Sequence, residues 1–181
     1  MPKKIVIPGR ELWDRKNNVF VYTEDKTITI EHSLVSISKW EAKWHIPFFG
    51  KEEKTREQIV DYIKCMTLTQ NVDDDVYLYL TNENVKEINE YLENPMTATW
   101  FRETKNKRND NRVVTSELIY YWMIALNIPV EFQKWHINRL ITLIKVCNEE
   151  NKPKNKMPLR DVYARNKALN EARRAQMHSK G

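Results

Sequence analysis

The segment from Thr115 to Glu149 constrains the fold most, because it contains the patterns of two apolar helices in succession. Thr115 and Ser116 are residue types that cap a helix start, since their hydroxyl oxygens can accept from unpaired backbone N–H groups. Asn127-Ile128-Pro129 ends the first helix, because proline cannot continue the backbone hydrogen-bond ladder. Pro129 also suits the first position of the second helix. We therefore predict an αα-hairpin at the centre of the core.

Both predicted helices are apolar over much of their circumference, which is typical of buried helices. We expect Trp122 and Trp135 to be buried and to face the same core from the two arms of the hairpin. The apolar positions at helical spacing are Leu118, Trp122, Ala125 and Leu126 in the first helix, and Val130, Phe132, Trp135, Ile137, Leu140, Ile141, Leu143, Ile144 and Cys147 in the second.

The composition of the 181-residue chain indicates one mainly helical domain with an appendage, since 30% of the residues are charged and only three are glycine. Cys65 and Cys147 fall in separate apolar helical patterns, so we expect two reduced core thiols and no disulfide. No stretch approaches the roughly 18 apolar residues of a membrane span, and the first residues lack the apolar run of a signal peptide. These features predict a cytoplasmic protein without a membrane partner.

Charge is distributed unevenly along the chain. Residues 151–181 contain nine Lys/Arg and two acidic residues, which leaves a net charge of +7, and residues 102–112 form a basic loop with a net charge of +3. The whole chain carries only +5, so the remaining residues carry −5. The sequence therefore describes a mildly acidic body with a basic loop and a basic tail.

Short strands are predicted near the N-terminus. Residues 4–9, 19–22 and 27–30 are rich in Val, Ile, Thr, Phe and Tyr, and Pro8-Gly9 stops the first of them. Residues 23–26 would form a hairpin loop between the second and third strands. Because so few strands are not stable alone, we expect a small antiparallel sheet that packs on the helices.

Helical periodicity begins after Ser33. Ser38 with Glu41 and Thr55 with Gln58 have the spacing of capping boxes, and Thr81 is placed to cap a third helix. Val76–Leu80 is ambiguous between a short helix and a strand. The predicted fold class is thus α+β, mainly α. Its predicted regions are a small β region packed on the helices (1–32), a helical core (33–150), and a basic linker with a terminal helix (151–181).

Few residues suggest catalysis or metal binding. Asp73, Asp74 and Asp75 are consecutive and do not converge on one cation, so a solvated loop that begins a helix is the favoured interpretation. Glu41 and His45 share a predicted helix face, but the sequence offers no third metal ligand. His136 has no nucleophile to activate and is interpreted as a boundary histidine. We predict no enzyme activity, no cofactor and no metal site.

The basic tail is the strongest candidate for a binding function, and three interpretations stay open: a solvated terminal helix, a docking arm for a protein partner, and a phosphate-binding element that acts with the basic loop. Aromatic residues would be expected among the cations of a nucleic-acid reader, and the Trp residues at 40, 44, 100, 122 and 135 are more typical of a core. Protein docking is therefore favoured over nucleic acid. The predicted partner-binding residues are Lys154, Lys156, Leu159, Arg160, Val162, Arg165, Leu169, Arg173 and Arg174.

Several long runs resemble proteins encoded among the tail genes of long-tailed bacteriophages. These runs are ITIEHSLVSISKWEAKW at 28–44, DYIKCMTLTQNV at 61–72, TSELIYYWMIALNIP at 115–129, QKWHINRLITLIKVCN at 133–148 and ALNEARRAQMHSKG at 168–181. The resemblance implies a small, largely helical, non-enzymatic protein of the host cytoplasm, most similar to a tail assembly chaperone. Such proteins coat the hydrophobic tape-measure protein until tail-tube subunits replace them.

The resemblance carries no functional residues with it, because these proteins share no defined site motif. It implies the tape-measure or tail-tube protein as the partner, and the acidic body could also accept the tail of a second copy in a homo-oligomer. The alternative functions are a virion structural protein such as a head–tail connector subunit, and a nucleic-acid-binding module that uses the basic loop and the tail.

Overall fold

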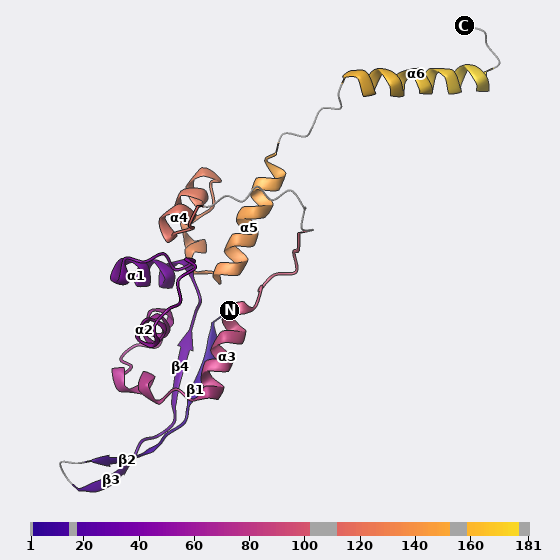
Figure 1. The fold of residues 1–181 in the computed structure, drawn as a ribbon. Helices are drawn as coiled ribbons and strands as arrows, with labels where there is room; N and C mark the ends of the chain where they lie inside the picture. Colours follow the sequence, from indigo (N-terminus) through magenta and orange to yellow (C-terminus); the bar gives the residue numbers. More distant parts are fainter. Residues whose placement is uncertain (1, 15–17, 102–111, 153–158, 178–181) are drawn as a thin grey trace. The chain divides into compact units, whose positions relative to one another are not determined.

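The computed structural model of the protein describes residues 2–14, 18–101, 112–152 and 159–177. The chain forms two compact units, residues 1–148 and residues 149–181. The first unit contains four strands and most of the helices, and the second contains the C-terminal helix (Figure 1). The predicted fold class is confirmed: the protein is mainly helical, with small antiparallel ladders at its N-terminus.

The strands form two antiparallel two-stranded ladders. Strand β1 (Lys3–Ile7) pairs with β4 (Lys26–Ile30), and β2 (Glu11–Asp14) pairs with β3 (Val19–Tyr22). Residues 19–22 and 27–30 are therefore strands as predicted, but their predicted pairing with each other is wrong, and β2 was not foreseen. Buried isoleucines alternate with more exposed residues in β1 and β4, which places Ile5, Ile7, Ile28 and Ile30 in the core.

The two ladders meet where the chain passes Gly9. The Gly9 N–H donates to Asp25 Oδ1 (2.8 Å), and the Arg10 N–H donates to Thr23 Oγ1 (2.8 Å). A Cβ atom at position 9 would lie 1.8 Å from the Thr23 carbonyl oxygen, so only glycine permits this approach. These side-chain hydrogen bonds hold residues 23–26, which were expected to form a hairpin loop. The β2–β3 ladder continues beyond the β1–β4 ladder (Figure 1).

Helix α1 (Leu34–Trp44) lies at the centre of the helical core, where α2, α4 and the 3-10 helix η2 pack against it. It begins earlier than the predicted Ser38 capping box, because Ser33 and Ser36 form the capping box instead. Trp40 is fully buried, and its indole N–H donates to the Gln58 carbonyl (2.9 Å). Helix α1 is therefore positioned by both apolar burial and a satisfied buried polar group.

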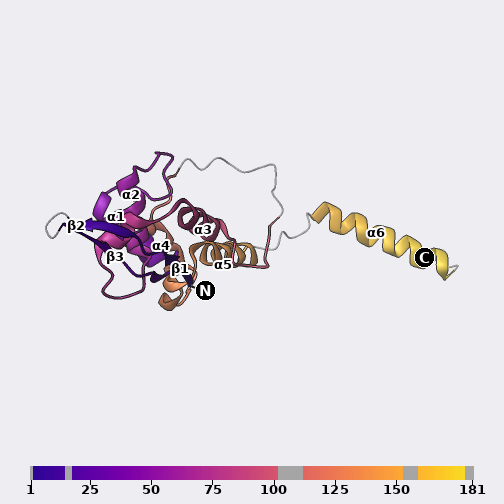
Figure 2. The same ribbon diagram turned by 90° about the horizontal axis from the view of Figure 1, so that it is seen from below.

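The next two helices, α2 and α3, begin where the capping patterns of the sequence predict. The capping box of Thr55 and Gln58 opens α2 (Arg56–Met66) as predicted, and Thr81 caps α3 (Asn82–Glu93), which packs beside β1. The ambiguous segment between α2 and α3 is a 3-10 helix, η1 (Asp74–Tyr79). Figure 2 shows the same elements from below.

Helices are present at both predicted positions, but the second is shorter than expected, and the first packs mainly against α1 rather than against its predicted hairpin partner. Thr115 caps α4 (Ser116–Ala125), and α5 spans Ile137–Glu150. The prediction that the second helix begins at Pro129 is wrong, because residues Val130–Lys134 form the 3-10 helix η2. The reason is tertiary: the Ile137 N–H donates to the His32 carbonyl (2.7 Å), which places the start of α5 at the corner between β4 and α1.

The expected burial of Trp122 and Trp135 is wrong, since both side chains are only partly buried. Trp122 packs against the edge of the core. Trp135 stacks on Phe132 with a centroid distance of 4.0 Å and lies under the guanidinium group of Arg139. Cys65 and Cys147 are free but half-buried, so the expected core thiols are also corrected. Periodicity marked the apolar faces without distinguishing the centre of the core from its margin.

We predict that Trp40→Ala lowers the free energy of unfolding by about 3–5 kcal/mol, the usual cost of deleting a buried large aromatic side chain. Trp122→Ala and Trp135→Ala should each cost about half of this or less, because these residues keep solvent contact. Urea unfolding followed by circular dichroism measures all three. Equal losses for the three variants would contradict the central position of Trp40.

Candidate partner-binding surfaces

The C-terminal helix α6 (Leu159–Gln176) contains most of the predicted partner-binding residues. All 18 of its residues are exposed, among them Leu159 at 74% and Leu169 at 47%. At 100° per residue, Leu159, Val162 and Leu169 lie within one third of the helix circumference. Arg173 falls within the same stripe, and Arg160 and Arg165 lie on opposite flanks. Lys154 and Lys156 lie outside the described residues.

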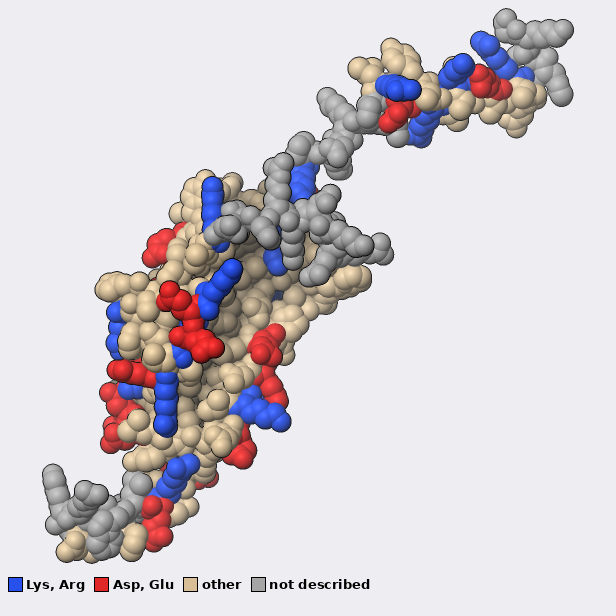
Figure 3. Space-filling model, in the orientation of Figure 1, with Lys and Arg blue, Asp and Glu red and all other residues tan. Residues whose placement is uncertain are grey.

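Three residues outside the predicted set complete this surface. Tyr163 and Met177, 69% and 77% exposed, widen the apolar stripe. Lys167 joins Arg160 and Arg174 in a row with a spacing of seven residues, so the three cations lie close to one line along the helix. The same helical periodicity could have found them. Figure 3 shows that Lys and Arg outnumber Asp and Glu on this helix, where Lys167 and Glu171 form an ion pair at 4.0 Å.

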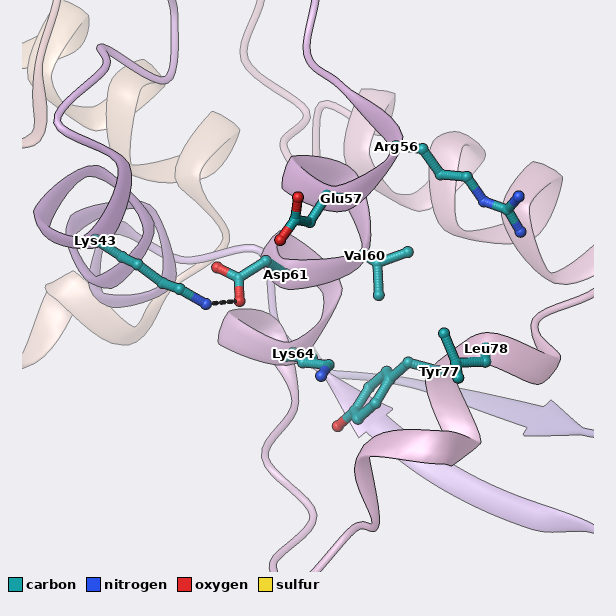
Figure 4. A pocket seen from close by; sticks show the side chains of 8 residues that line it. All are labelled: Lys43, Arg56, Glu57, Val60, Asp61, Lys64, Tyr77 and Leu78. Carbon is teal, nitrogen blue, oxygen red and sulfur yellow. Dashed lines mark hydrogen bonds and ion pairs between the residues drawn. The ribbon is translucent and has the colours of Figure 1, made fainter.

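An open pocket of about 620 Å³ lies between α2 and η1, beside the end of α1 (Figure 4). Its charged residues are largely paired: Lys43 with Asp61, and Lys64 with Asp74 at 2.7 Å. The hydrogen bond from Lys43 to Asp61 raises the pKa of the lysine. The indole N–H of Trp44 also donates to Asp61 (2.9 Å). This network connects α1 to α2.

The acidic residues considered as metal ligands have structural roles. Glu41 is buried, and its two carboxylate oxygens accept from the backbone N–H groups of Phe48 and Ser116, both at 2.7 Å. His45 is exposed at the left-handed C-cap of α1. Asp74 begins η1, and its hydrogen bond with Lys64 lowers its pKa. In the described part of the chain, no three His, Cys, Asp or Glu side chains gather in a metal-binding group.

A polar cluster is buried at the corner between β4 and α1. His32 Nδ1 is hydrogen-bonded to the Tyr62 hydroxyl, and the rings of His32 and His136 meet edge to face at 5.1 Å. His136 Nε2 donates to the Tyr91 carbonyl (3.1 Å), and the Tyr91 hydroxyl donates to Glu31 Oε1 (2.7 Å). The predicted boundary position of His136 is therefore wrong, because its side chain is only 2% exposed. Tyr62 and Tyr91 pair the buried polar groups of His32 and Glu31, so the cluster stabilises this corner of the fold.

Comparisons with known proteins found no matching family model, no matching curated protein and no matching solved structure. Within the described ranges, no helix has the length and apolar character needed to cross a membrane.

The histidine pair predicts a loss of stability in mild acid. Burial, with a smaller effect of His136, lowers the pKa of His32 from 6.5 to about 3, and burial also lowers the pKa of His136. The unfolded chain therefore binds protons that the folded chain excludes. The contribution of each histidine is complete above about pH 6.5 and declines as the pH falls below that value, by up to about 1.4 kcal/mol per pH unit.

Urea unfolding between pH 7.5 and pH 5 measures this slope, because most carboxylates titrate at lower pH. His32→Gln should flatten the slope. His45→Asn is the matched control, since His45 is an exposed histidine outside the buried cluster, so the slope of this variant should equal that of the parent. A parent protein whose stability is constant across this range would contradict the buried neutral pair.

Proposed function

We propose that this chain is a non-enzymatic assembly protein that binds a protein partner through α6. The observation that carries the proposal is the complete exposure of an 18-residue helix with an apolar stripe. A single helix of this length is only marginally stable in water without tertiary contacts. Insertion of Leu159, Val162 and Leu169 into a groove on another chain would bury the stripe and stabilise the helix.

The more specific proposal is a tail assembly chaperone of a long-tailed bacteriophage, acting in the host cytoplasm. The resemblance of residues 28–44, 115–129 and 133–148 to products of phage tail genes supports this choice. In this role α6 contacts apolar segments of the tape-measure protein and shields them from aggregation. Tail-tube subunits then compete for the same segments and release the chaperone. The flanking cations of α6 favour partner segments that also carry acidic residues.

A second candidate is a virion structural protein such as a head–tail connector subunit. The β2–β3 ladder favours this alternative, because Val19, Phe20 and Tyr22 are 48%, 65% and 70% exposed. In the described part of the chain, each strand of this ladder pairs only with the other and leaves its second edge open. Open edges with exposed apolar residues are suited to pairing between neighbouring subunits.

Mass spectrometry of purified phage particles separates these two functions. A chaperone is absent from the mature particle, whereas a connector subunit is present in fixed stoichiometry. Co-expression with the tape-measure protein provides the direct test, since the chaperone should keep it in the soluble fraction. A tape-measure protein that remains equally insoluble with and without this chain would contradict the chaperone function.

The role of α6 leads to a prediction about its cation row. Arg160→Glu, Lys167→Glu and Arg174→Glu, combined in one chain, should weaken partner capture about tenfold or more and leave the melting temperature unchanged, because the side chains are exposed. Isothermal titration and thermal melting measure the two effects. Binding to DNA and RNA across a salt series is the companion experiment. Sub-micromolar nucleic-acid affinity at about 150 mM salt, lost in the variant, would favour a nucleic-acid-binding module instead.

A further inference from the structure

A groove of about 470 Å³ opens on the residue 1–148 unit, at the corner where four helical elements begin or end. Its walls come from the first two turns of α1, the end of α2 with the residues after it, and the junction of η2 with α5. This volume is within the usual range of ligand-binding pockets. The lining residues used below are Glu31, Lys39, Leu68, Lys134, Trp135 and Arg139.

The rim of the groove is positively charged. Lys39, Lys134 and Arg139 are exposed and come from three different elements. Among the described residues, none of the three forms an ion pair with an acidic side chain, unlike Lys43 and Lys64 in the neighbouring pocket. Glu31 is the one carboxylate in the lining, and it is buried with the Tyr91 hydroxyl bonded to it. The groove thus presents cations that no acidic side chain of the described residues neutralises.

Two helix starts reinforce this charge. Helix α1 begins at Leu34 and α5 begins at Ile137, and the residues before both starts line the groove. Neither helix has an acidic residue in its first turn, whereas every other described helix has at least one. The positive end of a helix dipole is usually compensated by such an acid. Here that compensation is missing on both sides of the groove.

Several of the other residues that line the groove are apolar, and they determine which side chains it can hold. Leu68 is 55% exposed, and Val35, Cys65 and Met66 also line the groove. Phe132 and the Arg139 guanidinium group each lie 4.0 Å from the Trp135 ring, so they must occupy opposite faces of the indole. Because both faces are covered, Trp135 offers an edge and cannot stack on a nucleobase. The groove is therefore complementary to a ligand that combines apolar side chains with negative charge.

We propose that this groove binds an acidic peptide segment of a protein partner, with an aliphatic or aromatic side chain against Leu68 and the Trp135 edge and carboxylates at Lys39, Lys134 and Arg139. Charge complementarity identifies the occupant. The C-terminal helix of a second copy does not fit, because its apolar stripe is flanked by cations that the rim repels. This site goes beyond the function proposed for α6, since it uses other residues and another unit.

Selection from a display library of random 12-residue peptides, with the full-length protein as bait, tests the proposal. Enriched peptides should combine two or more acidic residues with a Leu, Ile, Phe or Trp. The double variant Lys39→Glu/Lys134→Glu should bind an enriched peptide at least about tenfold more weakly in fluorescence anisotropy. Leu68→Ser should weaken binding through the apolar contact alone, with its salt dependence unchanged.

The matched control is Lys86→Glu/Lys145→Glu, which makes the same charge change at two exposed lysines outside the groove lining. It should bind the enriched peptide as the parent does. Enrichment of basic or purely apolar peptides would overturn the proposal, as would equal weakening by the control variant. Displacement of the peptide by a 12-nucleotide RNA at lower concentration than by the free peptide would assign the groove to nucleic acid instead.

Discussion

The backbone between β4 and α1 connects three distant parts of the chain. The Glu31 N–H donates to the Met66 carbonyl (2.9 Å) at the end of α2, and the Ile137 N–H donates to the His32 carbonyl (2.7 Å) at the start of α5. Buried backbone groups must be paired, so these two bonds determine where both helices meet the sheet. The same corner contains the buried cluster around His32 and His136, and the groove opens beside it. Its geometry therefore controls both the polar core and the basic rim.

The residues that attract attention in the sequence are used for structure. Glu41 joins the loop after α1 to the start of α4 through two backbone N–H groups, and His136, the residue before α5, bonds to the Tyr91 carbonyl of α3. Each bond satisfies a polar group that burial would otherwise leave unpaired. A glutamate or histidine within a helical pattern is therefore weak evidence for catalysis, because such side chains also pair buried backbone groups where elements of the core meet.

The two proposed binding surfaces share one electrostatic character. Both α6 and the groove present cations next to exposed apolar side chains, so each is complementary to partner segments that combine carboxylates with apolar residues. An assembly protein with two such surfaces could hold separate segments of one long partner, which raises the effective concentration of the second contact. Such a mode of binding suits the proposed shielding of an extended protein.

Local features could be predicted from the sequence alone: the caps at Thr55, Thr81 and Thr115, the fold class, and the separation of a basic tail from the body. These features depend on residues that lie near one another in the sequence. Contacts between distant segments set the strand pairing, the late start of α5 and the burial of Trp40 rather than Trp122 or Trp135. Pairing across Gly9 and the bond from Ile137 to His32 join residues far apart in sequence. Periodicity identifies an apolar face, but the depth of a residue depends on which element covers that face. The groove could not be predicted for the same reason, since its cations come from three separate elements.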